Sequence, residues 1–579
     1  MTKISDKRGV QQFLHQAKSY GLKKIIVSPG SRNAPLSISF SQSPELECIV
    51  IPDERAAAFY ALGMAEQLNE PVAVVCTSGS AVLNYAPGVA EAFYRCIPLV
   101  IISADRPVQW IDQGDGQTIR QVGALSNHIL AETSLLEAPE SNAEVKFNRT
   151  EIQRVFTACL GAQKGPIHIN FPFNEPLYGT IESSNLEANQ LAIELIEHES
   201  RLLDEYELEE IKQVWSTTKK KMIICGQLEY QPQLQHVLSE LSADSSVAIL
   251  VENTSNLAHR RFIHCIDRTL NSISENQLDD QFQPELLISI GGAVISKRIK
   301  SFLRKSRKLT HWKVGYEFPK MDTYQHLKKS YQLEPSTFFR QLNTTQPKIN
   351  ISRYGEQWKQ LDYLIQDKHA AYFESAPYGD LSVFQYLMDI IPNDSFLHMA
   401  NSSVVRYCQL FDGLASLRYF CNRGTSGIDG STSTAIGAAM AKPDKLHTFI
   451  SGDISFFYDS NALWNQRLPN NIKIVVINNG GGGIFKIIPG PDTSEELDEF
   501  FVAKQNYSVE HLCKAFGVNY LSAKSIAEIE QQIASFYSQQ PNNQPVLMEV
   551  FTPQDENDKQ LKEYFEKIRL EKGKVKLFE

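Results

Sequence analysis

Features that mark nucleic-acid-binding, membrane and secreted proteins are missing from this sequence. The net charge is −10, so no overall positive charge favours nucleic acid or an anionic membrane surface. The apolar runs are no longer than strands, which predicts no membrane span. The first residues, Met1 to Gln16, are polar and hold no apolar segment for secretion. We therefore expect a cytoplasmic protein that binds neither nucleic acid nor a membrane.

The cysteine and glycine patterns argue against two further kinds of site. The nine cysteines are scattered and form neither a Cys-x-x-Cys pair nor a cluster with histidine at metal-ligand spacing. Such a set is typical of reduced, mostly buried thiols. The apolar run at residues 286–290 ends in two glycines but lacks the full fingerprint of a dinucleotide site.

What the sequence does contain is strand-length apolar runs separated by helices. In the first part of the chain, runs at residues 25–27, 72–76 and 99–102 each end in small or turn-forming residues. Runs this apolar indicate parallel strands covered by helices on both faces, with ligands bound at the carboxyl ends of the strands. A second strand–helix series includes the runs at 222–226 and 286–290.

A third series is predicted for the last part of the chain. Its strands are expected near residues 396–399, 448–450, 472–477 and 546–551. Polar stretches near residues 181–210 and 334–358 separate the three series, and the length suits several domains. We therefore predict three consecutive α/β domains with mostly parallel, helix-covered sheets. Their predicted bounds are 1–180, 181–350 and 351–579.

Two turns in the third segment suggest a magnesium and diphosphate site. Gly452-Asp453 follows one apolar strand, and Asn479 follows the next strand 26 positions later. A carboxylate, an amide carbonyl and a backbone carbonyl would give Mg²⁺ three oxygen ligands, and a bound diphosphate and water would complete the shell. Either turn alone is common in α/β proteins. The two at this spacing resemble the signature of thiamine-diphosphate-dependent enzymes, although Ile454 stands where that signature usually has glycine.

That resemblance implies a cofactor and its ligands. Thiamine diphosphate with Mg²⁺ or Mn²⁺ would bind here, with Gly452 at the diphosphate and with Asp453, Asn479 and the carbonyl of Gly481 on the metal. Ile428 matches the bulky residue that bends the cofactor. Further cofactor contacts are implied for Pro29, Ser402 and Gly427.

A glutamate in the first segment matches the family's activating carboxylate. Glu54 opens a helix of small residues, where an acid would otherwise only complement the helix dipole. In the family this carboxylate contacts the aminopyrimidine ring and helps it remove the proton from the thiazolium carbon. It faces the cofactor of the neighbouring subunit, which implies a homodimer with shared active sites, or a tetramer that contains such dimers.

Five segments narrow the resemblance beyond the cofactor. Residues 28–36, 104–107, 165–172, 401–406 and 422–429 are similar to the 2-succinyl-5-enolpyruvyl-6-hydroxy-3-cyclohexene-1-carboxylate (SEPHCHC) synthases of menaquinone biosynthesis. The resemblance implies decarboxylation of 2-oxoglutarate and conjugate addition of the succinyl unit to isochorismate. The resemblance is strong in the first and third predicted domains and weaker in the middle domain.

The residues in these segments suit substrates that each carry two carboxylates, because the arginine fork binds planar carboxylates. A single arginine at a strand end more often forms a weak surface ion pair. The matched basic residues are Arg32, Arg106, Arg406 and Arg423, with Lys297 from the middle segment. Ser31, Gln117 and Ser402 match hydrogen-bonding positions, and Ile484, Phe485 and Ile488 match an apolar wall. Catalytic roles are implied for Glu54, Gln117, Arg32 and Arg406.

The sequence departs from the family at two further positions, and two alternative functions remain open. Family members can carry asparagine at Gly480 and a polar residue at Gly483, so polar contacts from those positions are in doubt. One alternative is another thiamine-diphosphate 2-oxoacid decarboxylase or carboligase of the acetolactate-synthase type, which would not need the arginines. The other is a non-catalytic binding protein on the same fold.

Overall fold

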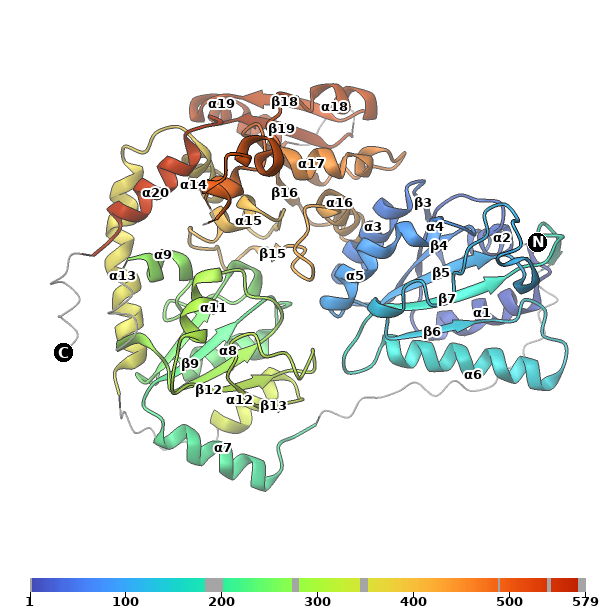
Figure 1. Cartoon of the computed structure of the whole chain (residues 1–579), viewed down its shortest axis with the longest axis horizontal. Helices are drawn as coiled ribbons and strands as arrows, with labels where there is room; N and C mark the ends of the chain where they lie inside the picture. Colours follow the sequence, from blue (N-terminus) through green and yellow to red (C-terminus); the bar gives the residue numbers. More distant parts are fainter. Residues whose placement is uncertain are drawn as a thin grey trace.

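Three parallel β-sheets follow one another along the chain (Figure 1). The computed structural model describes residues 3–182, 201–272, 281–343, 352–487, 490–538 and 543–570. Helices flank each sheet, which confirms the prediction of three α/β segments. The predicted bounds of the domains stay predictions, because residues 344–351 are not described and the bound at 180 falls inside a strand. No helix in the described part of the chain is long and apolar enough to cross a membrane.

The first sheet has six parallel strands in the order β3-β2-β4-β5-β7-β6. Its central strands β4 and β5 are buried along their whole length, as expected for apolar strands covered on both faces. A separate antiparallel pair, β1 with β8, joins the start and end of this part. The strands are β1 (Lys3–Ser5), β2 (Lys24–Val27), β3 (Glu47–Val50), β4 (Val72–Cys76), β5 (Leu99–Asp105), β6 (Ala131–Ser134), β7 (Ile167–Pro172) and β8 (Thr180–Glu182). The helices are α1 (Arg8–Ser19), α2 (Ala34–Ser41), α3 (Glu54–Leu68), α4 (Ala81–Asn84), α5 (Ala86–Tyr94) and α6 (Asn142–Cys159).

The second sheet has five parallel strands in the order β10-β9-β11-β12-β13. The helix α11 begins after Ser296, whose hydroxyl accepts the backbone N–H of Ile299 at 3.1 Å. The strands are β9 (Lys221–Cys225), β10 (Val247–Val251), β11 (Leu286–Ile290), β12 (Thr310–Val314) and β13 (Leu327–Tyr331). The helices are α7 (Glu205–Thr217), α8 (Pro232–Leu241), α9 (Ile266–Asn271), α11 (Lys297–Arg304) and α12 (Pro335–Asn343).

The third sheet has six parallel strands in the order β15-β14-β16-β17-β19-β18. The charged C-terminal part is helical, and its helix α20 packs on the domain, because Leu561 and Tyr564 are buried. The strands are β14 (Phe396–Met399), β15 (Arg418–Phe420), β16 (His447–Gly452), β17 (Ile472–Asn478), β18 (Asn519–Ala523) and β19 (Val546–Phe551). The α-helices are α13 (Tyr354–Phe373), α14 (Asp380–Ile390), α15 (Ser403–Cys408), α16 (Ser431–Ala441), α17 (Asp453–Tyr458), α18 (Glu510–Phe516), α19 (Ile526–Tyr537) and α20 (Asn557–Lys567).

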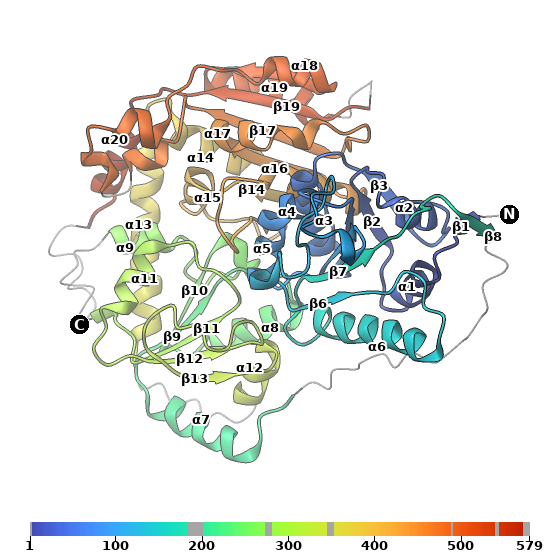
Figure 2. The same cartoon turned by 45° about the vertical axis from the view of Figure 1, so that its right-hand side comes forward.

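The first and third parts meet where α3 packs against α16 (Figures 1 and 2). Both helices are rich in alanine and glycine, so their backbones approach closely. The Tyr60 hydroxyl donates to the Ala462 carbonyl at 2.6 Å, and Asn461 donates to the Asp53 carboxylate at 2.7 Å. The long helix α13 runs beside the second sheet and the third part (Figure 1). The carboxyl ends of the first and third sheets are therefore held in one framework.

Candidate active site

The predicted residues fall into two groups on separate sheets. The N-terminal half-site consists of Pro29, Ser31, Arg32, Glu54, Arg106 and Gln117. The C-terminal half-site consists of Ser402, Arg406, Arg423, Gly427, Ile428, Gly452, Asp453, Asn479, Gly481, Ile484 and Phe485, with Lys297 from α11. Ile488 lies outside the described residues.

Glu54 begins α3, as predicted. Asp53 caps the helix by accepting the backbone N–H groups of Arg55 and Ala56, which fixes the first turn. The Glu54 carboxylate accepts a hydrogen bond from the Asn84 amide at 3.4 Å. Burial, together with the negative charge of Glu54, raises the pKa of Cys76 well above its usual value. Glu54 therefore lies near Cys76, at the carboxyl end of β4.

Two arginines of the N-terminal half-site lie close together. Arg32 is buried, and its guanidinium donates to the Phe173 carbonyl at 3.1 Å and to Glu175 at 3.3 Å. Burial and the nearby charge of Arg106 lower the pKa of Arg32. The Nε atom of Arg106 is buried without a hydrogen-bond partner among the described residues, and Asp115 lies 3.6 Å from it. Two neighbouring guanidinium groups with an unsatisfied donor suit a carboxylate ligand.

A buried network behind Arg106 was not found from the sequence. The Asp105 carboxylate accepts the backbone N–H of Arg106 at 2.7 Å and the Asn170 amide at 2.9 Å. Gln121 donates to the Asn170 carbonyl oxygen at 3.0 Å and accepts the backbone N–H of Gly79 at 2.8 Å. The network thus joins the loop after β4 to the loop after β5 and holds Arg106 in place.

The other N-terminal residues lie at the surface. Pro29, Ser31 and Gln117 are exposed. The Ser31 hydroxyl lies 3.2 Å from the Tyr178 hydroxyl, which is also exposed. Gln117 has a left-handed backbone with φ 52° and packs on the turn at Gly79. These three predicted residues lie in the loops that follow β2 and β5 of the first sheet.

Asp453 lies at the start of α17, directly after β16. Its side chain is buried, and one carboxylate oxygen accepts the backbone N–H of Gly481 at 2.9 Å and the Gln505 amide at 2.8 Å. Burial raises the pKa of Asp453 to about 6, against these donors. The loops after β16 and β17 therefore meet, as the spacing of the two turns predicted.

The Asn479 side chain is oriented by a buried acid. Its amide nitrogen donates to Asp380 at 2.9 Å, and Asp380 also accepts the Thr552 hydroxyl. The Asn479 carbonyl oxygen is thereby left as its open ligand atom. Among the described residues no three His, Cys, Asp or Glu side chains cluster as a metal site. The donor set of Asp453, Asn479 and the Gly481 carbonyl, all oxygens, fits Mg²⁺ or Mn²⁺ bound together with a diphosphate.

The residues around Gly480 explain why glycine follows Asn479. Gly480 has φ 75°, and a Cβ there would lie 2.7 Å from the Gln554 amide nitrogen. Gln554 donates to the Gly480 carbonyl at 2.8 Å, so a side-chain amide occupies the space where family members can carry asparagine. Ile484 is buried in the 3₁₀ turn that follows, and the Phe485 ring lies 5.9 Å from that of Phe501. This apolar wall stands beside the metal loop.

The loop that carries Ile428 is tied to the metal motif. The Ser455 hydroxyl, in α17, donates to the Ile428 carbonyl at 2.6 Å. The Asn401 amide donates to the Gly427 carbonyl at 2.7 Å. Ile428 therefore lies beside Asp453 rather than in a separate core.

A second pair of arginines lies in the C-terminal half-site. Arg423 is buried, and its guanidinium donates to Asn401 at 2.8 Å, while its Nε has no hydrogen-bond partner among the described residues. Arg406 donates to the carbonyl of Ser402, which has a left-handed φ of 70°. Burial and the charge of Arg423 lower the pKa of Arg406. This pair also suits an anionic ligand.

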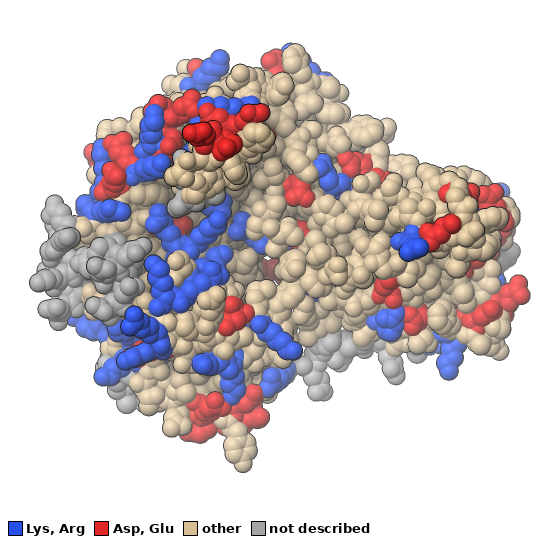
Figure 3. All heavy atoms as spheres, in the orientation of Figure 1, with Lys and Arg blue, Asp and Glu red and all other residues tan. Residues whose placement is uncertain are grey.

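The middle domain adds positive charge next to this pair. Lys297 is exposed at the start of α11, and burial together with Arg423 and Arg406 lowers the pKa of Lys300. Figure 3 shows lysine and arginine side chains gathered over α9 and α11, although the chain as a whole is acidic. Glu252 lies beneath and accepts the backbone N–H groups of Ile295 and Ser296 at 2.7 and 2.8 Å. The acid fixes the entry to α11, and no motif in the sequence marks it.

Glu54 and the metal motif are not bonded to each other in the described part of the chain. No hydrogen bond or ion pair there links Glu54 to Asp453, Asn479 or Ile428. The contacts between the two parts close to Glu54 include the Asp53–Asn461 hydrogen bond, the bond from Arg55 to the Tyr458 carbonyl and the α3–α16 packing.

Comparison with known families matches all three parts. Residues 7–124 match the model "Thiamine pyrophosphate enzyme, N-terminal TPP binding domain". Residues 194–399 match "Middle domain of thiamine pyrophosphate". Residues 402–550 match "Thiamine pyrophosphate enzyme, C-terminal TPP binding domain".

Relatives of known name cover nearly the whole chain. A 2-succinyl-5-enolpyruvyl-6-hydroxy-3-cyclohexene-1-carboxylate synthase of Flavobacterium johnsoniae is 42% identical over 96% of this chain and 98% of its own length. One from Porphyromonas gingivalis is 38% identical over 97% of both chains. One from Bacteroides thetaiotaomicron is 33% identical over 98% of this chain and 99% of its own length. The chain therefore belongs to the thiamine pyrophosphate enzymes and, within them, to the SEPHCHC synthase family.

Proposed function

We propose that this protein is a transferase that decarboxylates 2-oxoglutarate and adds the succinyl unit to isochorismate, giving SEPHCHC and CO₂ in menaquinone biosynthesis. The relatives carry the name of this activity. The observation that carries the proposal is the presence of two close arginine pairs, Arg32 with Arg106 in the N-terminal half-site and Arg406 with Arg423 in the half-site that holds the metal motif. Two dicarboxylate substrates need such donors, whereas a monocarboxylate such as pyruvate does not.

The C-terminal half-site would hold the cofactor. Asp453, Asn479 and the Gly481 carbonyl would bind Mg²⁺ or Mn²⁺, with the diphosphate near Gly452, and Ile428 would support the bent cofactor. Pro29, Ser402 and Gly427 would make further contacts. When bound, thiamine diphosphate supplies the carbon nucleophile and the electron sink for loss of CO₂.

Side chains of the protein would move protons and hold substrate. Glu54 would hold a proton at the aminopyrimidine, in surroundings where burial keeps Cys76 uncharged. Ser31, Gln117 and Ser402 would hydrogen-bond substrate. Ile484 and Phe485, together with Ile488, would exclude water from the reacting carbon.

The active site would be shared between two copies of the chain. In the described part of the chain Glu54 has no hydrogen bond to the metal motif, and the large side chains of Leu83, Tyr458 and Trp464 are exposed on the elements around it. A second copy would cover them and bring its metal motif to Glu54. The protein would therefore form a homodimer, or a tetramer built from such dimers. The nine cysteines are free, which suits a reducing compartment, and we assign the protein to the cytoplasm.

Mixing two inactive variants tests the shared site. Glu54→Gln and Asp453→Ala would each be inactive alone. A mixed dimer would regain one intact site, built from Glu54 of one chain and Asp453 of the other. Activity regained after unfolding and refolding the two variants together supports the shared site, and none regained while each variant sediments as a dimer contradicts it.

Carbon dioxide release tests the reaction. Release from 2-oxoglutarate, with thiamine diphosphate and Mg²⁺, should depend on isochorismate, and the product should have the mass of SEPHCHC. Release from pyruvate that ignores isochorismate would favour the acetolactate-synthase type instead. Failure to bind thiamine diphosphate in calorimetry would favour a non-catalytic binding protein.

A further inference from the structure

A loop of the C-terminal half-site is held by residues of all three domains. The segment from Cys421 to Gly430 links β15 to α16 and carries both Arg423 and Ile428. Asn401 and Ser455, of the C-terminal domain, bind its far end at Gly427 and Ile428. Its near end is held from the other two domains.

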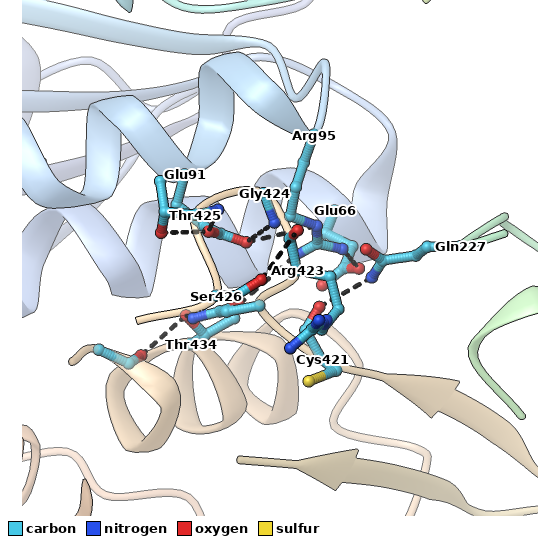
Figure 4. A network of polar contacts seen from close by, with 12 residues as sticks. Glu66, Glu91, Arg95, Gln227, Cys421, Arg423, Gly424, Thr425, Ser426 and Thr434 are labelled. Atoms are coloured by element: carbon cyan, nitrogen blue, oxygen red, sulfur yellow. Dashed lines mark hydrogen bonds and ion pairs between the residues drawn. The ribbon is translucent and has the colours of Figure 1, made fainter. Parts of the chain in front are cut away.

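Glu91 binds the near end from the N-terminal domain (Figure 4). Glu91 lies in α5 and is 1% exposed. Its Oε1 atom accepts the backbone N–H of Gly424 at 2.8 Å, and its Oε2 atom accepts the backbone N–H and the hydroxyl of Thr425 at 2.7 and 2.8 Å. Three donors from the loop thus converge on one buried carboxylate, an arrangement of strong, charge-assisted hydrogen bonds.

The close approach at this point requires glycine. A Cβ at position 424 would lie 2.7 Å from the Glu91 carbonyl oxygen and 3.0 Å from its Oε2 atom. No other residue would let the backbone reach the carboxylate without displacing α5. The sequence Arg423-Gly424-Thr425 is therefore matched to Glu91.

The carboxylate has a buried counter-charge. Arg95 lies one turn further along, forms an ion pair with Glu66 and has its Nε 3.9 Å from Glu91. Although burial alone would lower it, the charges of Glu66 and Glu91 raise the pKa of Arg95. The middle domain adds Gln227, which donates to the Cys421 carbonyl at 2.8 Å. Figure 4 shows these side chains converging on the loop from separate ribbons.

We propose that Glu91 is a positioning residue that acts through Arg423 and fixes the substrate-binding guanidinium from another domain. Arg423 directly precedes the two residues that Glu91 binds, whereas Gly427 is bound by Asn401 and Ile428 by Ser455. Glu91 therefore affects the substrate held by Arg423 and leaves the cofactor pocket intact. This inference rests on the proposed function, because it takes Arg423 as a substrate ligand.

The variant Glu91→Gln tests the inference. It keeps the shape of the side chain but turns one acceptor oxygen into a donor that faces a backbone N–H. The KM of the substrate that Arg423 binds, identified by the KM change in Arg423→Lys, should rise about tenfold. The dissociation constant of thiamine diphosphate, measured by calorimetry, should stay within about twofold. In the double variant Glu91→Gln/Arg423→Lys, the first change should add less than about twofold to the KM effect of the second.

Two further variants separate positioning from stability. Glu66→Gln is the matched control, because Glu66 belongs to the same buried cluster and pairs with Arg95, but makes no hydrogen bond to the loop among the described residues. It should lower the melting temperature as Glu91→Gln does, without the rise in KM. If Glu91→Gln does not fold, Thr425→Val removes one of the three donors from the loop side and should raise the same KM by about threefold.

Other results would overturn the inference. These are a weakening of cofactor binding as large as the change in KM, full additivity with Arg423→Lys, or the same rise in KM in Glu66→Gln. Failure of the proposed function is recognised separately, because the wild-type protein would then release no CO₂ in response to isochorismate.

Discussion

The two half-sites differ in how firmly they are held. In the C-terminal half-site, Asp453 and Arg423 are buried, and hydrogen bonds from other loops and domains fix the segments that carry them. In the N-terminal half-site, Ser31 and Gln117 are exposed, and only Arg32 and Arg106 are fixed by buried partners. A site that binds a cofactor permanently gains from preorganised ligands, whereas a face that meets a second copy and passing substrates must stay open. We infer that the C-terminal half-site is built to hold the cofactor and one substrate carboxylate, and the N-terminal half-site for proton transfer and the entry of substrate.

Removing the metal ligand should have the largest effect. Asp453→Ala deletes the carboxylate on which the two metal loops converge, so kcat/KM should fall by more than about 10⁴-fold because both metal and diphosphate binding are lost. Calorimetry should show no thiamine diphosphate binding at millimolar Mg²⁺. The matched control is Asp444→Ala, an exposed acid in the turn before β16. Retained cofactor affinity in Asp453→Ala would remove Asp453 from the metal site.

Glu54→Gln should show most clearly that proton transfer and cofactor binding depend on different half-sites. Loss of one positioned proton-transfer group lowers the rate by about 10²- to 10⁴-fold. Cofactor affinity should change little, since the ligands of the C-terminal half-site are untouched. The exchange of the thiazolium proton, followed by NMR, should slow in parallel with kcat. Glu47→Gln, an exposed acid on β3, is the control. Normal proton exchange in Glu54→Gln would contradict the role of Glu54.

Arg423→Ala should have a smaller effect than either. It removes a buried donor to a substrate carboxylate, and a charged hydrogen bond of this kind corresponds to about 10- to 100-fold in KM. Arg304→Ala is the matched control, because Arg304 is exposed on α11 and donates to the Thr323 carbonyl. Steady-state kinetics with each substrate varied in turn gives the KM values of both variants. An unchanged KM for both substrates would show that the C-terminal arginine pair binds no substrate.

Much of this arrangement was predictable because its signals are local. Asp453 and Asn479 each follow an apolar strand, so the strands and turns around them could be read from neighbouring residues. The structure confirms the strands and brings Asp453 to Gly481. The roles of Glu54 and the arginines came from resemblance to a family, since an acid or arginine at a strand end has no chemistry of its own to distinguish it.

The supporting residues could not be predicted, because tertiary packing alone brings them together. Gln505 donates to Asp453 from 52 positions away, and Asp380 orients Asn479 from 99 positions away. Glu91 reaches Thr425 across 334 positions. Each is an ordinary polar residue on a helix or loop, with no motif around it. Sequence motifs therefore predict the residues that contact the cofactor. They predict less well the residues that hold those contacts in place.

The smallest effect should come from Ser103→Ala, behind the N-terminal half-site. The Ser103 hydroxyl has one proton and lies 2.8 Å from the Asn170 carbonyl oxygen and 2.7 Å from His168 Nε2. The Asn170 amide nitrogen already donates to Asp105, so its oxygen faces Ser103 and accepts a hydrogen bond from the hydroxyl. Deleting the hydroxyl leaves the buried Nε2 atom of His168 without its partner, whereas the Asn170 oxygen keeps Gln121, and should destabilise the fold by about 1–3 kcal/mol.

Activity should change much less than stability in Ser103→Ala. Asp105 still accepts the backbone N–H of Arg106 without Ser103, so kcat/KM should stay within about threefold of wild type. Thermal unfolding measures the loss of stability, with Ser41→Ala, an exposed serine of α2, as the control. A large loss of activity at unchanged stability would mean that the network behind Arg106 serves the reaction directly, and that the N-terminal half-site is as strictly positioned as the C-terminal one.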